Sequence, residues 1–256
     1  MRLLSMNIWG THGDWDARRE LLAGLFAQHD PDVVTLQETI VRDGHDQVRD
    51  LLAGRNVVHS GTRAADGSGI TTASRWPIIA AHELELPCGP RNADFPATTL
   101  ITEIDAPGGP LLLVNHFPSW KLQLEAERCD QTLAAARAIE DLCPDLQAPV
   151  VVAGDFDADP DSTSIRFWTG RHPLEGHSVC YRDAWDAVQP GSPGHTFTPE
   201  NPLLADEDWP FGRIDYVMVR CAVHGGAAMR IRDCRIIGDD PPASDHYGLL
   251  ADLERR

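Results

Sequence analysis

Short, almost uninterrupted apolar segments are the feature of this sequence that most restricts its fold. Residues 3–8, 32–36, 111–117 and 149–153 each consist almost entirely of apolar side chains. A strand with one face in water alternates apolar and polar residues, whereas a strand covered on both faces is apolar throughout. The chain is therefore predicted to contain sheets that are covered on both sides.

Between residues 69 and 116 the pattern changes to short apolar runs separated by prolines. No helical segment joins these runs, so we expect them to pair mainly as antiparallel strands. The strands expected in this region are residues 70–73, 78–86, 97–104 and 111–117, and three further strands are expected at residues 214–219, 229–237 and 247–253.

Helices are expected in three places. Asp14 or Asp16 can cap a helix that ends near residue 27, and apolar residues at three- and four-residue steps predict a long helix over 122–143. Residues 162–168 are expected to form a short helix. Helices interspersed among mixed strands favour an α+β protein, a two-sheet mixed β-sandwich flanked by helices. Without repeats or linkers, residues 1–256 are predicted to form a single domain.

The charge balance restricts the partners. The chain has 22 Lys and Arg against 39 Asp and Glu, a formal net charge of −17, and Lys121 is its single lysine. Proteins that hold long stretches of phosphate backbone usually present a basic surface. The sequence therefore favours a small molecule over nucleic acid as the partner.

Targeting signals and cysteine spacing bear on location. No apolar run approaches the length of a membrane span, and no signal-peptide pattern follows Met1. The six cysteines show no Cys-x-x-Cys pair and no zinc-finger spacing, so we expect reduced thiols. These features predict a cytoplasmic protein without a transmembrane segment.

Polar residues stand at the ends of the predicted apolar strands. Asn7, Glu38, His116 and Asp155 follow strands, whereas Asp215 and the pair Asp245-His246 precede them. If the first four strands run in one direction and the last two in the other, all these positions meet at one edge of the sandwich. The sequence therefore predicts a single cleft that holds carboxylates, an amide and imidazoles.

Such a cluster of carboxylates requires a positive partner. Uncompensated, the carboxylates would raise one another's pKa values by repulsion. Oxygen ligands from Asp, Glu and an amide suit Mg²⁺ (or Mn²⁺) better than zinc. Mg²⁺ is commonly held by one or two carboxylates and a substrate phosphate, so the cleft is predicted to perform phosphoester chemistry.

The order of these motifs resembles the endonuclease/exonuclease/phosphatase superfamily, whose members include deoxyribonuclease-like metal-dependent phosphoesterases. The resemblance extends from residue 7 to residue 246 and implies a four-layer α/β/β/α fold and divalent-metal-dependent phosphoester hydrolysis. Its motifs are Asn7, Gln37-Glu38, Ser74-Arg75-x-Pro77, Asn115-His116, Gly154-Asp155-Phe156-Asp157, Arg213-Ile214-Asp215-Tyr216 and Ser244-Asp245-His246.

The resemblance assigns a metal-binding role to several residues. It implies that Glu38 is the principal metal ligand and that Asn7 and Asp245 complete or orient the metal site. Asp155 is a candidate metal ligand and also the candidate for activating or positioning the attacking water. The cation would polarise a phosphoryl oxygen and stabilise the leaving oxygen.

The same resemblance assigns residues to the substrate. His246 is expected to donate to a phosphate oxygen, and Asp215 to hold the other ring nitrogen of His246. His116 is the candidate second phosphate contact and a general acid. Arg128 is either a phosphate contact or the partner of Glu125 in a helical salt bridge.

Residue 157 departs from the family pattern, which has asparagine two residues after the catalytic aspartate. If Asp155 and Asp157 lie in extended backbone, both side chains point to the same face. A second carboxylate there would repel phosphate unless it is protonated or paired with a cation. The hypothesis is that Asp157 binds a second metal ion or carries a shared proton.

Three functions remain open from the sequence. The first is hydrolysis of a small-molecule or lipid-head-group phosphodiester or monoester. The second is a DNA or RNA endonuclease or exonuclease of the repair type, and the third is a phosphate-binding module that has lost catalysis. Four aromatic residues could line the mouth of the cleft, but aromatic residues near loops and helix ends are more often packing residues, so they are interpreted as such and left out of the catalytic set. They are Trp120, Trp168, Trp209 and Phe211.

Overall fold

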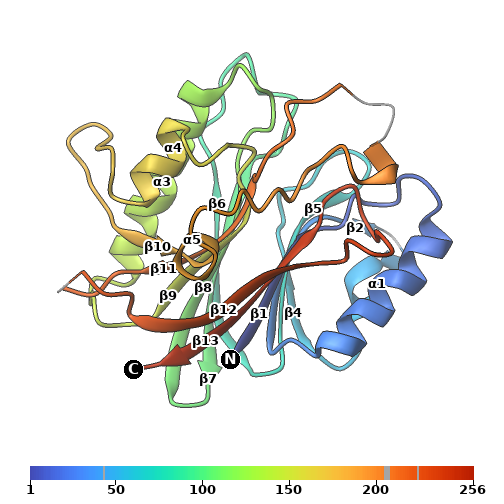
Figure 1. Ribbon diagram of the computed structural model, residues 1–256, viewed down its shortest axis with the longest axis horizontal. Coiled ribbons are helices and arrows are strands. Elements are labelled where there is room, and N and C mark those ends of the chain that lie inside the picture. Colours follow the sequence, from blue (N-terminus) through green and yellow to red (C-terminus); the bar gives the residue numbers. More distant parts are fainter. Residues whose placement is uncertain (43, 205–207, 224) are drawn as a thin grey trace.

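Two mixed β-sheets pack face to face, and helices cover their outer sides (Figure 1). The computed structural model describes residues 1–42, 44–204, 208–223 and 225–256. The helices are α1 (Trp15–His29), α2 (Gln47–Leu51), α3 (Glu125–Leu142), α4 (Thr163–Trp168), α5 (Ala184–Val188) and a 3₁₀ turn at Pro202–Leu204. The strands are β1 (Arg2–Asn7), β2 (Val33–Arg42), β3 (His45–Asp46), β4 (Asn56–His59), β5 (Ser68–Ser74), β6 (Ile78–Glu85), β7 (Thr98–Ala106), β8 (Gly109–Phe117), β9 (Val150–Asp155), β10 (Tyr181–Asp183), β11 (Asp215–Arg220), β12 (Met229–Ile237) and β13 (Gly248–Arg255).

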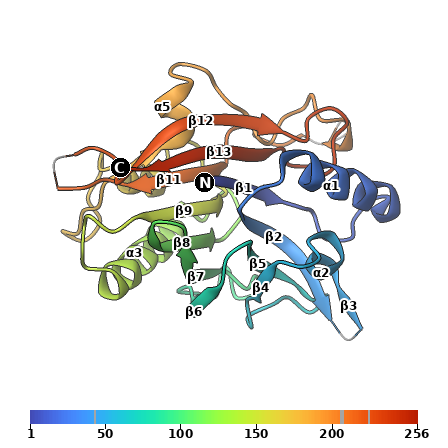
Figure 2. The ribbon, with the colours of Figure 1, turned by 90° about the horizontal axis from the view of Figure 1, so that it is seen from below.

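The two sheets have related strand orders. The first sheet runs β12-β13-β1-β2-β5-β4, with β3 paired to β2, and the second runs β10-β11-β9-β8-β7-β6. Figure 2 shows the central strands of both sheets beside each other, with α5 next to β12. Each sheet contains one parallel pair, β1 with β2 and β8 with β9, and the other pairs are antiparallel.

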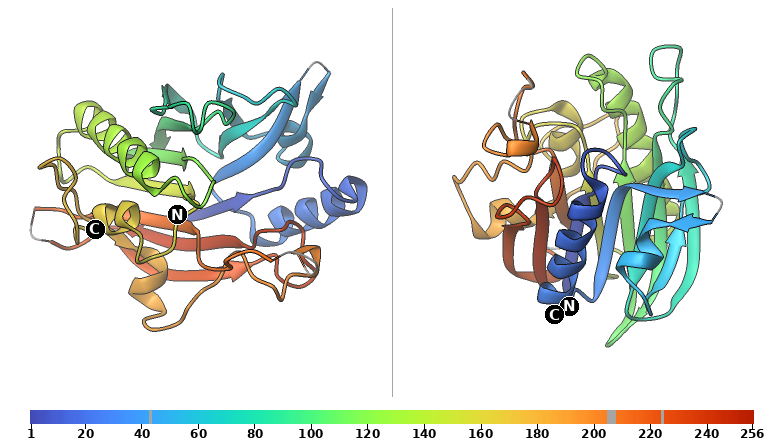
Figure 3. Two further views of the ribbon diagram at one scale, coloured as in Figure 1. Left: turned by 90° about the horizontal axis from the view of Figure 1, so that it is seen from above. Right: turned by 90° about the vertical axis from the view of Figure 1, so that its right-hand side faces the viewer.

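Three apolar layers explain the near-continuous apolar strands. The central layer lies between the sheets and includes Leu3, Leu113 and Val151. A second layer packs α1 and α2 on the first sheet, and a third packs α3 and α4 on the second sheet. Figure 3 shows α1 and α3 over different sheets, on opposite outer sides. The predicted two-sheet α+β sandwich is therefore confirmed.

The predicted strand directions are also confirmed. β13 is antiparallel to β1, and β11 is antiparallel to β9. In the register of β9 and β11, Asp155 lies directly opposite Asp215. The end of one strand therefore meets the start of its neighbour, which brings polar residues distant in sequence to one edge of the sandwich.

Several element boundaries differ from the sequence predictions. The second strand was expected to stop at residue 36, but β2 continues to Arg42 through an irregular register between Leu36 and Thr39. Helix α1 begins after the cap Asp14 as expected and extends to His29, where Asp30 ends it in a left-handed conformation. The short elements β3, α2, β4, β10 and α5 were not predicted, because few residues carry the periodicity in each.

The described residues also bear on membrane spans and on the state of the cysteines. None of their helices is both long enough and apolar enough to cross a membrane. All six cysteines lie among these residues and are free thiols.

Gly154 allows β8 and β9 to approach closely just before the site. Its φ is +152°, and a Cβ atom there would lie 2.1 Å from the carbonyl oxygen of His116. No side chain fits between these backbones, so glycine is required immediately before Asp155. The close approach fixes where β9 places the Asp155 carboxylate.

We predict that Gly154→Ala lowers the free energy of unfolding by at least about 2 kcal/mol, because the new methyl group overlaps backbone that cannot move without separating the strands. Gly24→Ala in α1 is the control, since nothing lies within 4 Å of a Cβ there. That change should stabilise the protein by about 0.5–1 kcal/mol. Urea unfolding measures both, and equal effects of the two substitutions would contradict the prediction.

Candidate active site and metal centre

A cleft of about 600 Å³ opens at the edge where the two sheets present their polar ends. Four carboxylates and His246 line it, together with several aromatic side chains. The carboxylates are those of Glu38, Asp155, Asp157 and Asp245. The cleft thus combines residues from β2, β5, β8, β9 and the segment before β13, which belong to both sheets.

Glu38 reaches the cleft because its strand is irregular. It lies within β2 rather than at its end, where the pairing with β5 shifts between Leu36 and Thr39. Its φ of +56° is unusual for a non-glycine residue and carries a cost of roughly 1–3 kcal/mol. Such strain is commonly held at functional sites, since it turns a side chain out of the regular alternation.

Asn7 connects the carboxylates of the two sheets. Its Nδ2 donates to Glu38 Oε1 and to Asp155 Oδ2, both at 3.0 Å. Its Oδ1 accepts from the backbone N–H of Trp9 at 2.9 Å. In this structure Asn7 therefore bonds to two carboxylates that the sequence predicts to bind metal.

The polar pair Gln37 and Asn115 holds the sheets together beneath the site. Gln37 Nε2 donates to Asn115 Oδ1 at 2.7 Å, and Asn115 Nδ2 donates to the carbonyls of Leu36 and Thr71. All these groups are buried. The two motif residues therefore have a positioning role that the sequence pattern alone does not reveal.

The segment before β13 is tied to the same edge. The Ser244 hydroxyl donates to the Asn7 carbonyl at 2.8 Å. Asn201 Nδ2 donates to the carbonyls of Ser244 and Asp245 at 2.8 and 2.9 Å. These bonds fix the backbone that carries Asp245 and His246.

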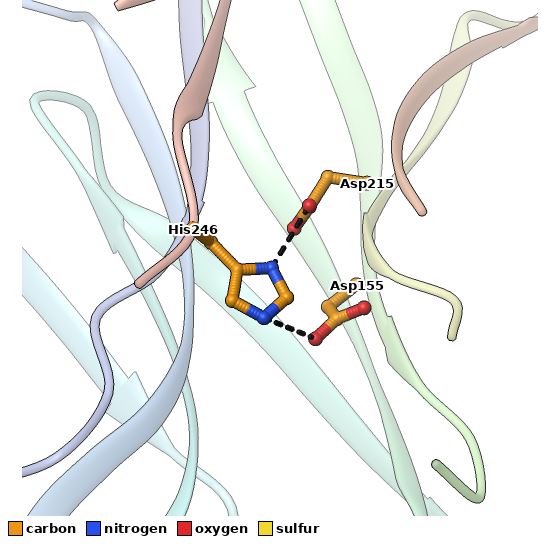
Figure 4. A group of neighbouring side chains, drawn as sticks. All are labelled: Asp155, Asp215 and His246. Atoms are coloured by element: carbon orange, nitrogen blue, oxygen red, sulfur yellow. Dashed lines mark hydrogen bonds and ion pairs between the residues drawn. The ribbon is translucent and has the colours of Figure 1, made fainter. Parts of the chain in front are cut away.

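His246 lies between two aspartates (Figure 4). Its Nδ1 is 3.0 Å from Asp215 Oδ2, and its Nε2 is 3.9 Å from Asp155 Oδ2. Burial lowers the pKa of His246, but the charges of Asp215, Asp155 and Asp245 outweigh burial and hold that pKa well above its ordinary value. The ring is therefore an imidazolium that can donate a hydrogen bond into the cleft.

The carboxyl groups around this imidazolium have raised pKa values. Burial, Asp157 and Asp215 raise the pKa of Asp155 well above its ordinary value, although His246 opposes them. Burial raises the pKa of Asp157 to about 7 and that of Asp245 to about 6, again against the charge of His246. Clustered carboxylates with raised pKa values are typical of functional sites.

A divalent cation fits the carboxylate side of this cluster. Three possible ligand atoms lie within 4.8 Å of one another, one each from Asp155, Asp215 and His246. However, a protonated imidazole does not ligate metal, so we place a cation nearer Glu38, Asp155 and Asp245. Among the described residues, the buried Oδ1 of Asp215 and Oδ2 of Asp157 have no hydrogen-bond partner, so these oxygens are free to face a cation.

Asp157 does not have the extended backbone that its spacing from Asp155 suggested. Its φ is +49°, and its N–H donates to Asp155 Oδ1 at 3.1 Å. Asp and Asn tolerate this left-handed conformation better than most residues. The turn, rather than strand alternation, brings both carboxylates into the same cleft.

The structure does not bring His116 into the cluster. His116 is fully buried, its Nδ1 lies 2.7 Å from Thr99 Oγ1, and its ring contacts Phe156 and Trp168. These neighbours belong to the layer under α3 and α4, on the outer face of the second sheet. Burial lowers the pKa of His116 to about 3, so the ring is neutral and a role as general acid finds no support here.

Arg128 is held by protein groups. Its Nε bonds Glu125 Oε2 at 2.9 Å, and its terminal nitrogens donate to the carbonyls of Ser119, Lys121 and Leu122. The salt-bridge alternative for Arg128 is therefore the one that the structure shows. Its charge still acts on the site, because it lowers the pKa of Asp157.

Aromatic walls are the part of the cleft for which the sequence analysis preferred the wrong alternative. Trp120 and Trp209, interpreted as packing residues, line the cleft, whereas Trp168 is fully buried in the core. Phe211 packs against Phe197, with ring centroids 5.5 Å apart. No spacing rule predicts these walls, since their residues come from loops. They are Trp9, Phe95, Phe117, Trp120, Phe197 and Trp209.

The model of the Endonuclease/Exonuclease/phosphatase family matches residues 4–246, almost the whole chain. The chain belongs to this family. The family resemblance of the sequence motifs is thereby confirmed, and the chain is a metal-dependent phosphoric ester hydrolase. No curated protein matches the chain in sequence.

Solved structures share the fold along the full chain. TDP2 from D. rerio, complexed with single strand DNA product, has a TM-score of 0.76 at 19% identity and covers 99% of this chain and 98% of its own. The human Nocturnin catalytic domain gives 0.75 at 15% identity, covering 100% and 94%. A functionally unknown conserved protein from Enterococcus faecalis V583 gives 0.74 at 18% identity, covering 100% of both chains. These likenesses show the fold alone.

The raised pKa of Asp157 predicts a pH-dependent effect of Asp157→Asn. Between pH 3.8 and about 7 the folded metal-free protein retains a proton that the unfolded chain has released, so this carboxyl lowers stability as the pH rises. Asp157→Asn removes this loss of stability at higher pH. Near pH 8 we expect the variant to be more stable than the wild type by roughly 1–3 kcal/mol, and near pH 3 by almost nothing.

Urea unfolding with a chelator present measures this difference across the pH range. Asp141→Asn, which changes an exposed aspartate on the last turns of α3, is the matched control and should show no such trend. A stability difference that is independent of pH would contradict the prediction.

Proposed function

We propose that this protein hydrolyses a phosphodiester or monoester of a small molecule, with Mg²⁺ or Mn²⁺ as the cofactor. The observation that carries the proposal is the pairing of an imidazolium with a group of carboxylates in one cleft: His246 between Asp155 and Asp215, beside Glu38 and Asp245. A cation at the carboxylates and a donor at His246 together suit a phosphate group, since each binds a different oxygen.

The protein's own residues have separate tasks in this proposal. His246 donates through Nε2 to a phosphate oxygen and supports the charge that develops in the transition state. Asp215 holds Nδ1 of the ring at 3.0 Å, which fixes the direction of that donor. Asp155, oriented by Asn7 at 3.0 Å, accepts a proton from the attacking water or positions it.

Glu38, Asp245 and Asp155 would hold the cation, with Asn7 as their orienting neighbour. When bound, the cation supplies Lewis-acid polarisation of a phosphoryl oxygen and neutralises the leaving oxygen. In this proposal Asp157 binds a second cation or shares a proton with Asp155. Two observations support it: the Asp157 N–H donates to that carboxylate, and its own Oδ2 is unpartnered among the described residues.

Nuclease activity is the second candidate. It is favoured by the similarity to D. rerio TDP2, a structure complexed with single strand DNA product. The net charge of −17 and an acidic cleft oppose it, because a polymer brings further phosphates that require basic partners. A phosphate-binding module that has lost hydrolysis is the third reading, and the complete His246–Asp215–Asp155 arrangement disfavours it.

We predict metal-dependent hydrolysis of bis-p-nitrophenyl phosphate that falls by at least about 10³-fold in His246→Ala and in Asp155→Asn, because each removes a group that acts on the phosphate or the water. Release of p-nitrophenol measures the rate. His82→Ala and Asp141→Asn change exposed residues of the same types and should retain wild-type activity.

Two outcomes would overturn this assignment. Rapid cleavage of supercoiled plasmid or abasic-site oligonucleotides at low enzyme concentration would replace it with the nuclease. An absence of hydrolysis over a broad panel of phosphoesters, with inorganic phosphate still bound, would replace it with the binding module.

For the second cation, we predict two Mn²⁺ sites of unequal affinity in the wild type and one in Asp157→Asn, because the substitution removes a ligand oxygen but preserves the size of the side chain. Isothermal titration of the metal-free protein measures the number of sites. A single site that the substitution leaves unchanged would exclude the second cation and leave the shared proton as the role of Asp157.

A further inference from the structure

The walls of the cleft are much richer in aromatic rings than the chain as a whole. Six of the sixteen residues that line it are Phe or Trp, whereas aromatic residues make up 7% of the sequence. Ligand pockets are commonly lined by apolar and aromatic side chains with a few polar groups at one end. Here the polar end is the carboxylate and imidazolium cluster.

Several of these apolar side chains are exposed at the mouth of the cleft. Trp120 and Trp209 are 41% and 36% exposed, and Leu122 is 56% exposed. Seven large apolar side chains are strongly exposed in the described part of the chain, and three of them gather at this one mouth. Apolar surface that is concentrated around a cleft marks a binding site more often than chance exposure does.

The rings form a continuous run from the mouth to the catalytic imidazole. Trp120 and Trp209 meet edge to face, with centroids 6.4 Å apart, and Trp209 meets Phe197 at the same distance. Phe197 lies 4.9 Å from the ring of His246. A planar group that extends from a phosphate at His246 would therefore lie along aromatic rings, in the arrangements that aromatic pairs prefer.

The charges of the cleft restrict what else the substrate can carry. Among the described residues, those that line the cleft include no Lys or Arg. The neighbouring Lys121 pairs with Asp94 at 2.7 Å, and the guanidinium of Arg18 is used by backbone carbonyls. A second phosphate would therefore meet carboxylates without a basic partner. The part of the substrate beyond the reacting phosphate must therefore carry no further negative charge.

We propose that Trp120, Trp209 and Phe197 bind a planar aromatic group that carries no negative charge and is attached to a single phosphate, and so determine the substrate class. This inference rests on the proposed function and deepens it. The aromatic group is either a phenol-type ring or a nucleobase, which share the same stacking face. A lipid tail suits the site less well, because the rings lie in a concave cleft and the net charge of −17 opposes approach to an anionic membrane.

The test compares ligands of equal charge that differ only in the ring. With Mn²⁺ present, isothermal titration should show benzyl phosphate binding at least about fivefold more tightly than cyclohexylmethyl phosphate, because only the aromatic ring stacks. Trp120→Ala and Trp209→Ala should abolish this preference, and Trp120→Phe and Trp209→Phe should retain most of it. The control Ile79→Ala removes another exposed apolar side chain, which lies on β6 outside the cleft.

Inorganic phosphate, which has no ring, separates this inference from the proposed function. Its affinity should be the same within about twofold in the wild type and the tryptophan variants, because the phosphate contacts are untouched. Equal affinities for the two ring phosphates, or tighter binding of octyl phosphate, would overturn the aromatic site. A retained ring preference without hydrolysis of bis-p-nitrophenyl phosphate would overturn the proposed function and support the aromatic site. Thymidine 5′-monophosphate against phenyl phosphate then decides between nucleobase and phenol.

Discussion

Repulsion among buried carboxylates is the constraint on which the rest of this structure depends. At the edge of the sandwich Asp157 and Asp215 act on Asp155, and Glu38 acts on Asp245, and burial strengthens the repulsion in both groups. His246 compensates part of it as an imidazolium, and a divalent cation suits the remainder. The features that make the edge costly for folding, namely buried oxygens and a strained Glu38, are the same ones that give it affinity for a metal and a phosphate.

The sequence predicts the fold well because its strongest signals are long and redundant. Apolar strands covered on both faces require two outer layers, and polar residues at the strand ends require particular strand directions, which the pairing of Asp155 with Asp215 confirms. Single-residue geometry is where sequence reasoning fails. Glu38 and Asp157 reach the cleft through left-handed backbone, and nothing in the local spacing indicates that conformation.

His116 shows a second limit of sequence reasoning. Its place after an apolar strand and before a loop is the same as that of a catalytic residue, but the alternation of β8 turns its side chain to the outer layer, and Asn115 faces the other sheet instead. A shift of one residue in a strand exchanges the two faces. The aromatic walls are hard to predict for a different reason, because loop residues follow no periodicity and gather only when the chain is folded.

The wide sequence separation of the site residues has a consequence for how the protein gains activity. Asn7 contacts Asp155, which is 148 positions away, and Ser244 binds the Asn7 carbonyl across 237 positions. Contacts of such long range form late, because the loops that they close are entropically expensive. A chain in which only one sheet has formed therefore lacks a complete active site. The onset of phosphoester hydrolysis after synthesis then reports the docking of the two sheets and not the formation of either sheet.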